Sequence, residues 1–113
     1  MEICGIIEKG KRHGTTLGYP TANIQLTQLV EGGIYAAKAH VDGQAHIAAV
    51  FVDPTRHLLE AHLLDFSGDI YEKELRVELL KKIRDSRKFE DEESLKIAIE
   101  IDIAEIRAYF DDI

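Results

Sequence analysis

The sequence predicts a mainly β fold: a small antiparallel barrel over about residues 1–85, followed by one helix over about residues 91–110. Strand-like segments and turn signals fill the chain as far as Ile83, and the apolar spacing changes to a helical period after Phe89. No linker, repeat or low-complexity stretch separates the two parts. We therefore expect a single compact domain over residues 1–113.

Five strand-like stretches follow one another along the predicted barrel. In chain order they are EICGIIEK, GIYAAKAHV, QAHIAAVFV, HLLEAHLLDF and KELRVELLKKI. Asp42-Gly43, a strong hairpin signal, joins the second stretch to the third. Gly68 and Asp69 suit a turn between the fourth and the fifth, which we expect to pair with each other. Five or more strands in so short a chain favour a closed barrel, because closure removes exposed strand edges.

The helix is predicted from apolar residues that lie three or four positions apart and form one stripe. They are Leu95, Ile99, Ile103, Ile106 and Phe110. Asp91 is the expected N-cap, and Glu92 and Glu93 would lie favourably near the positive end of the helix dipole. We expect the stripe to pack against the barrel.

The composition is that of an ordinary globular protein, with 45% hydrophobic and 31% charged residues. No apolar run approaches the roughly 20 residues that a membrane-spanning helix needs, and the N-terminus lacks a signal-peptide pattern, so we expect a cytoplasmic protein. The single cysteine, Cys4, fits a reducing compartment. The formal net charge of −7 argues against a general nucleic-acid binder.

The stretch LGYPTANI is the first candidate for a binding site. Pro20 favours stiff, extended backbone, in which alternate side chains point the same way. Thr21 and Asn23 would therefore present a hydroxyl and an amide oxygen side by side, a pair that suits a hard cation or a phosphate. Just before this stretch, Lys11 and Arg12 lie among glycines whose backbone N–H groups could cradle phosphate, although the spacing matches neither a P-loop nor a Rossmann motif.

Glu60 lies in the middle of the apolar strand-like stretch HLLEAHLLDF. A buried carboxylate there is costly without a partner, so it should be paired, protonated or retained for function. Two interpretations stay open: a general base, or a salt bridge, for example with Arg76 on the next strand. His62 is expected to be a packed or hydrogen-bonded histidine, and His40 and His46 without a third ligand make a weak case for zinc.

Four stretches together resemble the riboflavin kinase family, in order and over nearly the whole chain. They are GIIEKGKRHGTTLGYPTANI, GGIYAAKAHVDG, LLEAHLLDFSGDIYEKELRVELLKKIRDSRKFEDEESL and IEIDIAEIRAY. Within them lie the family's P-T-A-N motif, its E-x-H-L-L-D-F strand and its R-x-x-x-K-F loop before an acidic helix start. The chain looks like the kinase domain of bacterial bifunctional riboflavin kinase/FAD synthetases, here expected to stand alone and not to make FAD.

The resemblance implies a six-stranded Greek-key barrel with a C-terminal helix, which transfers the γ-phosphate of ATP to the 5′-hydroxyl of riboflavin and gives FMN and ADP. By the same resemblance Glu60 is the general base, and Thr21 and Asn23 hold Mg²⁺, or another divalent cation, with the nucleotide phosphates. Gly10, Lys11 and Arg12 would complete the nucleotide site. The flavin would be contacted from the loop 84–89 by Arg84, Arg87 and Phe89.

Three departures from the family pattern keep an alternative open. The family usually carries basic side chains where this chain has His13 and Thr15, its loop before Glu60 is longer, and a common glycine is replaced by Glu72. The alternative is a flavin- or nucleotide-binding module without turnover, and a barrel for protein or nucleic-acid interactions is a third interpretation.

We expect a monomer that binds riboflavin, FMN, ATP and ADP but neither nucleic acid nor membrane. We also expect flavin to order the loop 84–89.

Overall fold

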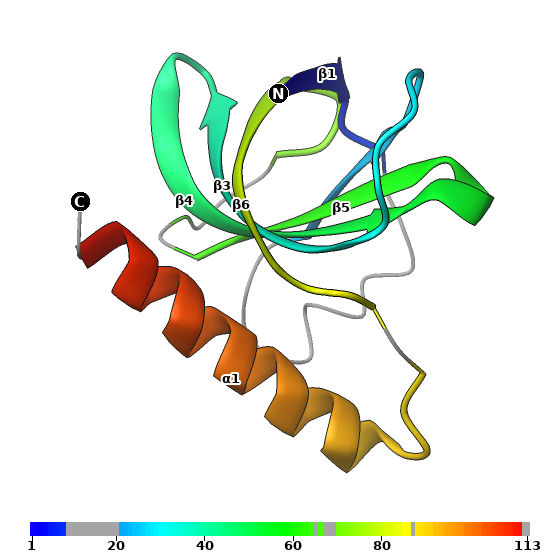
Figure 1. Ribbon diagram of the computed structural model, residues 1–113. Coiled ribbons are helices and arrows are strands. Elements are labelled where there is room, and N and C mark those ends of the chain that lie inside the picture. The colour runs from blue at the N-terminus through cyan, green and yellow to red at the C-terminus, as the bar shows by residue number, and fades with distance from the viewer. Residues whose placement is uncertain (9–20, 65, 67–69, 87, 112–113) are drawn as a thin grey trace.

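Six antiparallel strands curl into a nearly closed barrel in the computed structural model, and one helix packs on its outside (Figure 1). The structure describes residues 1–8, 21–64, 66, 70–86 and 88–111. Its elements are β1 (Glu2–Ile6), β2 (Thr21–Gln25), β3 (Gly33–Val41), β4 (Gln44–Asp53), a 3₁₀ turn (Pro54–Arg56), β5 (Leu58–Leu63), β6 (Glu74–Arg84) and α1 (Glu92–Asp111). The predicted mainly β fold with a C-terminal helix is confirmed.

The strands pair in the order β1-β6-β3-β4-β5-β2, and every pair is antiparallel. Strands β3, β4 and β5 are consecutive neighbours, whereas β2 returns to lie beside β5, which is the Greek-key arrangement that the family resemblance implies. The two edge strands approach each other just beyond the end of β1, where Glu8 N–H donates to Asn23 O at 2.7 Å. This bridge nearly closes the barrel and shortens its exposed edge.

The expected pairing of the fourth and fifth predicted strands with each other is wrong. β5 lies between β4 and β2, and β6 lies between β3 and β1. The 11-residue β6 pairs along the nine-residue β3, which satisfies more of its backbone hydrogen-bonding groups than the six-residue β5 could. The salt bridge from Glu60 to Arg76 depended on that pairing; Arg76 Nη1 instead donates to Glu2 Oε1 on β1, at 3.3 Å.

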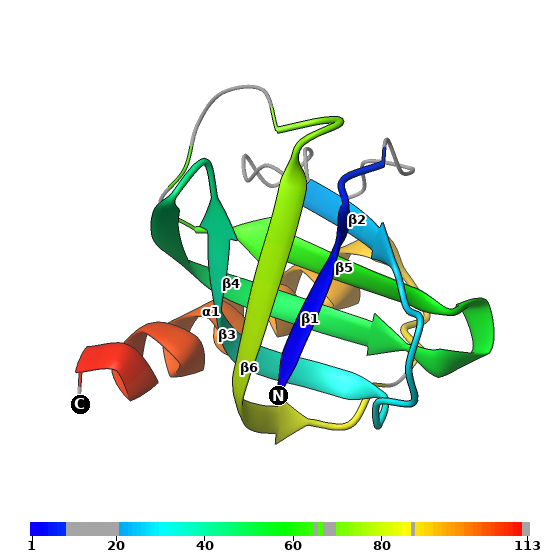
Figure 2. The same ribbon diagram turned by 90° about the horizontal axis from the view of Figure 1, so that it is seen from above.

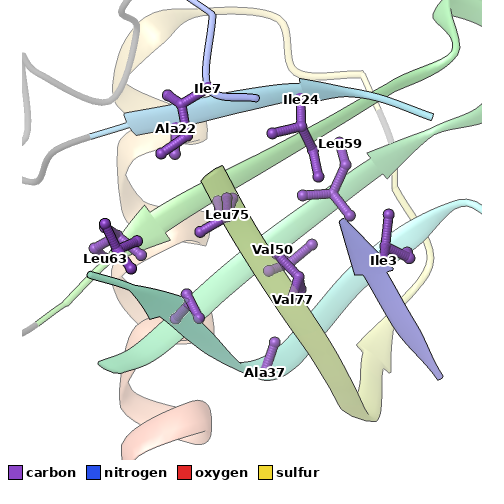
Figure 3. Close-up of a cluster of buried hydrophobic side chains, with 14 of the residues drawn as sticks. Ile3, Ile7, Ala22, Ile24, Ala37, Val50, Leu59, Leu63, Leu75 and Val77 are labelled. Carbon is purple, nitrogen blue, oxygen red and sulfur yellow. The ribbon is translucent and has the colours of Figure 1, made fainter. Parts of the chain in front are cut away.

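Alternation along the strands fills the barrel interior with apolar side chains. In β5, every second residue from Leu59 to Leu63 is fully buried, and the positions between them, Glu60 and His62, are partly exposed. Side chains from β2, β4 and β6 meet them inside the barrel, among them Ile24 of β2 (Figure 3). Glu60 and His62 therefore lie on the outer face.

Helix α1 crosses the outside of the barrel over β3, β4 and β6 (Figure 2). The cluster of buried side chains between helix and barrel, called here the helix cluster, consists of Ala36, Ala49, Leu64, Ile103 and Ile106. Of the predicted stripe, Leu95 is 37% exposed, so burial begins only in the second turn. Asp91 is confirmed as the N-cap: its Oδ1 accepts the backbone N–H of Ser94 at 2.7 Å, which lowers the pKa of Asp91.

Two connections of the barrel are built from short-range interactions. Asp42 and Gly43 have φ values of 52° and 78°, as a two-residue type I′ turn requires, so the predicted β3–β4 hairpin is confirmed. In the short loop before β5, Thr55 Oγ1 donates to Asp53 Oδ1 at 2.5 Å and Arg56 Nε donates to Asp53 Oδ2 at 2.6 Å. Both hydrogen bonds lower the pKa of Asp53. This capped turn is how the chain joins β4 to β5 with few residues.

Glu72 is the position where relief of backbone strain should stabilise the fold. Its φ is 68°, a left-handed conformation that costs a residue with a side chain roughly 1 kcal/mol or more, and it accounts for the glycine that the family pattern has there. The side chain is exposed, and the backbone N–H, which donates to Ile7 O at 2.9 Å, would be kept in glycine. We expect Glu72→Gly to raise the free energy of unfolding by about 1 kcal/mol in urea titrations.

The matched control is Glu74→Gly, the same exchange two residues later at an exposed position of β6. Extended backbone gives glycine no advantage there, and the added freedom of the unfolded chain should lower stability. A loss of stability in both variants would contradict the strain at Glu72.

Candidate functional site

The pairing of β2 with β5 brings two of the predicted site residues opposite each other. Its register places Asn23 opposite Glu60, and Thr21 opposite His62. Residues directly opposite each other in an antiparallel pair have Cβ atoms roughly 5 Å apart and on the same face. Because the intervening positions, such as Leu59, fill the interior, Asn23 and Glu60 meet on the outer face of the barrel.

Glu60 is hydrogen-bonded along its own strand to His62. Glu60 Oε1 lies 3.1 Å from His62 Nε2, and the two side chains are 19% and 12% exposed. An ionised carboxylate only accepts hydrogen bonds, so the imidazole donates through Nε2. Its other nitrogen, Nδ1, is buried and has no hydrogen-bond partner among the described residues. The prediction that His62 is hydrogen-bonded is confirmed.

Asn23 presents a buried acceptor beside this carboxylate. The residue is 4% exposed, and no described residue donates a hydrogen bond to its side-chain oxygen Oδ1. A buried polar atom without a partner costs roughly 1–3 kcal/mol, which a ligand at this position would recover. Amide and carboxylate oxygens are the ligands that Mg²⁺ and Ca²⁺ accept, so the donor set fits a hard cation. For Thr21 the structure describes the backbone, at the start of β2.

On its other side the Glu60–His62 pair is flanked by β4. Phe51 lies opposite Glu60, and Ala49 lies opposite His62. Ala49 belongs to the helix cluster, as does Leu64, two residues beyond His62. The His62 end of the pair therefore borders the apolar contact between α1 and the barrel, whereas the Glu60 end faces Asn23.

Arg84, at the end of β6, is held by α1. Its Nε and Nη2 donate to Asp102 Oδ1 and Oδ2, each at 2.8 Å, and its Nη1 donates to Asp85 O at 3.0 Å. Asp102 is 4% exposed, and the hydrogen bonds that it accepts raise the pKa of the Arg84 guanidinium. The guanidinium also lies 5.7 Å from the centroid of the Phe89 ring. The structure thus gives Arg84 a partner in the helix, while its contact with flavin stays a prediction.

Sequence reasoning missed two features of this region. The opposition of Asn23 and Glu60 follows from the pairing of β2 with β5, which no local pattern indicates. Asp102 carried a signal: it lies four residues from both Ala98 and Ile106, and all three occupy the buried face of α1. An acid at such a position indicates a partner in the neighbouring element, because an unpaired buried charge is costly.

Other predicted site residues lie outside the described part of the chain: Gly10, Lys11, Arg12 and Arg87. Within the described part, no three His, Cys, Asp or Glu side chains come together as they would around a metal ion. No described helix is long and apolar enough to cross a membrane.

Comparison with known proteins identifies the family. A model of the riboflavin kinase family matches residues 1–110. A bifunctional riboflavin kinase/FMN adenylyltransferase of Pseudomonas fluorescens is 38% identical over 117 residues, which cover 96% of this chain and 38% of that protein. The RNA-binding riboflavin kinase RibR of Bacillus subtilis is 36% identical over 117 residues, which cover 96% of this chain and 51% of that protein.

The chain therefore belongs to the riboflavin kinase family, as its motifs predicted. It spans 38% of the length of the bifunctional relative from Pseudomonas fluorescens and about half of RibR. Among solved structures, the crystal structure of a macrolide-efflux protein from Streptococcus pneumoniae matches with a TM-score of 0.79 at 26% identity, over 94% of this chain and 36% of that chain.

The bidentate pair between Arg84 and Asp102 should contribute to stability. Asp102→Asn leaves the guanidinium without its buried carboxylate, a change that costs about 3–5 kcal/mol where both charges are buried. The Arg84 side chain is 26% exposed and can turn toward water, so we expect a smaller loss of about 2 kcal/mol in the free energy of unfolding, measured by urea titration.

Asp85→Asn is the matched control, because the side chain of Asp85 is 88% exposed although its Oδ1 lies 2.6 Å from Lys82 Nζ. A surface ion pair of this kind adds little to stability. Equal losses in the two variants would show that burial of Asp102 adds nothing to the pair.

Proposed function

We propose that this chain is an ATP-dependent riboflavin kinase, which transfers the γ-phosphate of ATP to the 5′-hydroxyl of riboflavin and gives FMN and ADP. The observation that carries the proposal is the register that sets Asn23, whose buried Oδ1 has no partner among the described residues, opposite Glu60. Phosphoryl transfer requires a metal that neutralises phosphate charge and a group that receives the hydroxyl proton, close to each other. Two relatives named as riboflavin kinases support the choice of substrates.

Glu60 is the general base in this proposal. It accepts the proton of the 5′-hydroxyl as the hydroxyl oxygen forms a bond to the γ-phosphorus. The bond between that phosphorus and the β,γ-bridging oxygen breaks, ADP leaves, and the proton passes from the Glu60 carboxyl to solvent. A side chain that is 19% exposed on the outer face can reach a substrate while most of its surface is shielded from water.

Thr21 and Asn23 would hold Mg²⁺, or another divalent cation, at the nucleotide phosphates. The buried Oδ1 of Asn23 fits this assignment, because it is an oxygen ligand without another partner among the described residues. The cation would neutralise charge on the β- and γ-phosphates. Both side chains are neutral, so the pair alone should bind Mg²⁺ weakly and take it up with the nucleotide. In this proposal the nucleotide site is completed by Gly10, Lys11 and Arg12.

Riboflavin would be contacted from the loop 84–89, by Arg84, Arg87 and Phe89. This loop connects β6 to α1, and α1 crosses the outer face of the barrel on which Glu60 lies. The bidentate pair of Arg84 with Asp102 would in addition fix the start of the loop.

We further propose that residues 1–113 form a single domain, that it acts as a monomer in the cytoplasm, and that it needs no nucleic-acid or membrane partner. The RNA-binding relative RibR makes RNA the alternative to test. A formal net charge of −7 disfavours it, since RNA binding gains affinity from basic surface.

The first test of the proposal is product formation. Purified protein incubated with riboflavin, ATP and Mg²⁺ should form FMN, which chromatography separates from riboflavin. Glu60→Gln should keep the fold and riboflavin binding but lower the rate roughly 10²- to 10⁴-fold, the usual contribution of a general base. Glu74→Gln makes the same chemical change at an exposed position of β6 and should leave the rate unaltered.

Two results would count against this proposal. Riboflavin binding without FMN formation from any nucleoside triphosphate would support a flavin-binding module without turnover. An unaltered rate in Glu60→Gln would remove Glu60 from the mechanism.

The second test concerns the metal and nucleotide site. Asn23→Leu keeps the size of the side chain and removes its oxygen, and Thr21→Val does the same for the hydroxyl. Each should weaken Mg²⁺-dependent ATP binding, measured by calorimetry, far more than riboflavin binding. Gln25→Leu removes an amide from an exposed position of the same strand and should affect neither ligand. Equal losses for both ligands would mean that Thr21 and Asn23 serve only the fold.

A further inference from the structure

We propose that His62 is a positioning residue for Glu60, an inference that rests on the kinase function proposed above. The Nε2–H group of His62 holds Glu60 Oε1 and thereby sets the direction in which the carboxylate meets the substrate hydroxyl. His62 itself touches neither riboflavin nor ATP in this proposal, and it acts through Glu60 alone.

The hydrogen bond restrains a side chain that would otherwise sample several conformations. A glutamate has three side-chain torsions, and loss of such freedom costs up to about 2 kcal/mol when it is imposed only as the substrate binds. Glu60 and His62 lie two residues apart on one face of β5, with Oε1 and Nε2 at 3.1 Å. The bond therefore selects a carboxylate orientation on a rigid strand before any substrate arrives.

The imidazole is held by packing in its turn. His62 is 12% exposed and has Ala49 opposite it on β4. Ala49 and Leu64, the residue that follows the end of β5, both belong to the helix cluster. The ring therefore borders the contact of α1 with the barrel, where close packing leaves few alternative rotamers.

A purely structural role would favour another residue at this position. Nδ1 of His62 is buried without a hydrogen-bond partner among the described residues, a state that lowers stability by roughly 1–3 kcal/mol in general. Leucine occupies position 58 on the same face of the strand and has no polar atom to satisfy. Among the described residues, the hydrogen bond to Glu60 is the polar contact that accounts for an imidazole at this position.

Three variants separate the hydrogen bond from the packing. In the His62→Gln variant the side-chain amide nitrogen lies near the place of Nε2, and in His62→Asn it lies near the place of Nδ1. The His62→Leu variant has no side-chain nitrogen. We expect His62→Leu and His62→Asn to lower kcat for FMN formation roughly 10- to 100-fold, as for a misplaced catalytic group, with little change in KM for riboflavin or ATP. His62→Gln should recover most of the lost kcat.

The control variant is His40→Leu. His40 is also a partly buried histidine near a carboxylate, with its Nε2 3.8 Å from Glu78 Oε2, but it lies on β3 next to the β3–β4 turn. The His40→Leu variant should keep the kcat of the wild-type protein. Thermal unfolding of all variants shows whether each is folded.

A double variant tests whether His62 acts through Glu60. If it does, Glu60→Gln combined with His62→Leu should be no slower than Glu60→Gln alone, because the base that His62 orients is already lost. Two losses that multiply would overturn the proposal. So would wild-type kcat in His62→Leu, a loss confined to KM, or a His62→Gln variant as slow as His62→Leu.

The outcomes also separate this inference from the proposed function. If the wild-type protein forms no FMN, the kinase function fails, and the positioning role is rejected with it. If the wild-type protein forms FMN and His62→Leu forms it equally fast, only the positioning role is rejected.

Discussion

The register between β2 and β5 is the constraint on which the candidate site depends. Side chains alternate between the two faces of a strand, so a slip of one residue would move Asn23 or Glu60 from the outer face into the core. Ala22 and Ile24 on β2 and Ala61 on β5 are fully buried, and a slip would exchange such residues for polar ones. The apolar interior of the barrel therefore enforces the opposition of an amide oxygen and a carboxylate on its exterior.

The closing bridge of the barrel adds to this constraint. β2 has only five residues, yet it is held on both sides: β5 pairs along one edge, and Glu8 N–H donates to Asn23 O on the other. The carbonyl of Asn23 is thus satisfied by the barrel itself, while no described residue donates to its side-chain Oδ1. The strand is fixed by its backbone, so a ligand that bound Oδ1, as proposed, would not compete with folding.

The features that the sequence predicts correctly are local ones. The β3–β4 hairpin follows from Asp42-Gly43, and the start of α1 follows from Asp91. The neighbours of β5 and β6 were predicted wrongly, because two adjacent strand patterns favour a hairpin unless distant strands offer longer pairing partners. For the same reason the sequence indicated that Asn23 and Glu60 are functional, from their residue types and motifs, but not that they lie opposite each other.

Helix α1 connects the two regions that the proposed reaction needs to hold in a fixed relative position. Its Asp102 fixes Arg84 at the start of the loop 84–89, and its apolar face covers Ala49 and Leu64, which flank His62. One rigid element therefore borders both the loop proposed to contact the flavin and the pair proposed to receive the proton. A loop is otherwise among the least stable parts of a fold, and it positions a substrate reproducibly only when its ends are anchored. The buried Asp102 anchors one end, while the helix cluster keeps that anchor in fixed relation to Glu60.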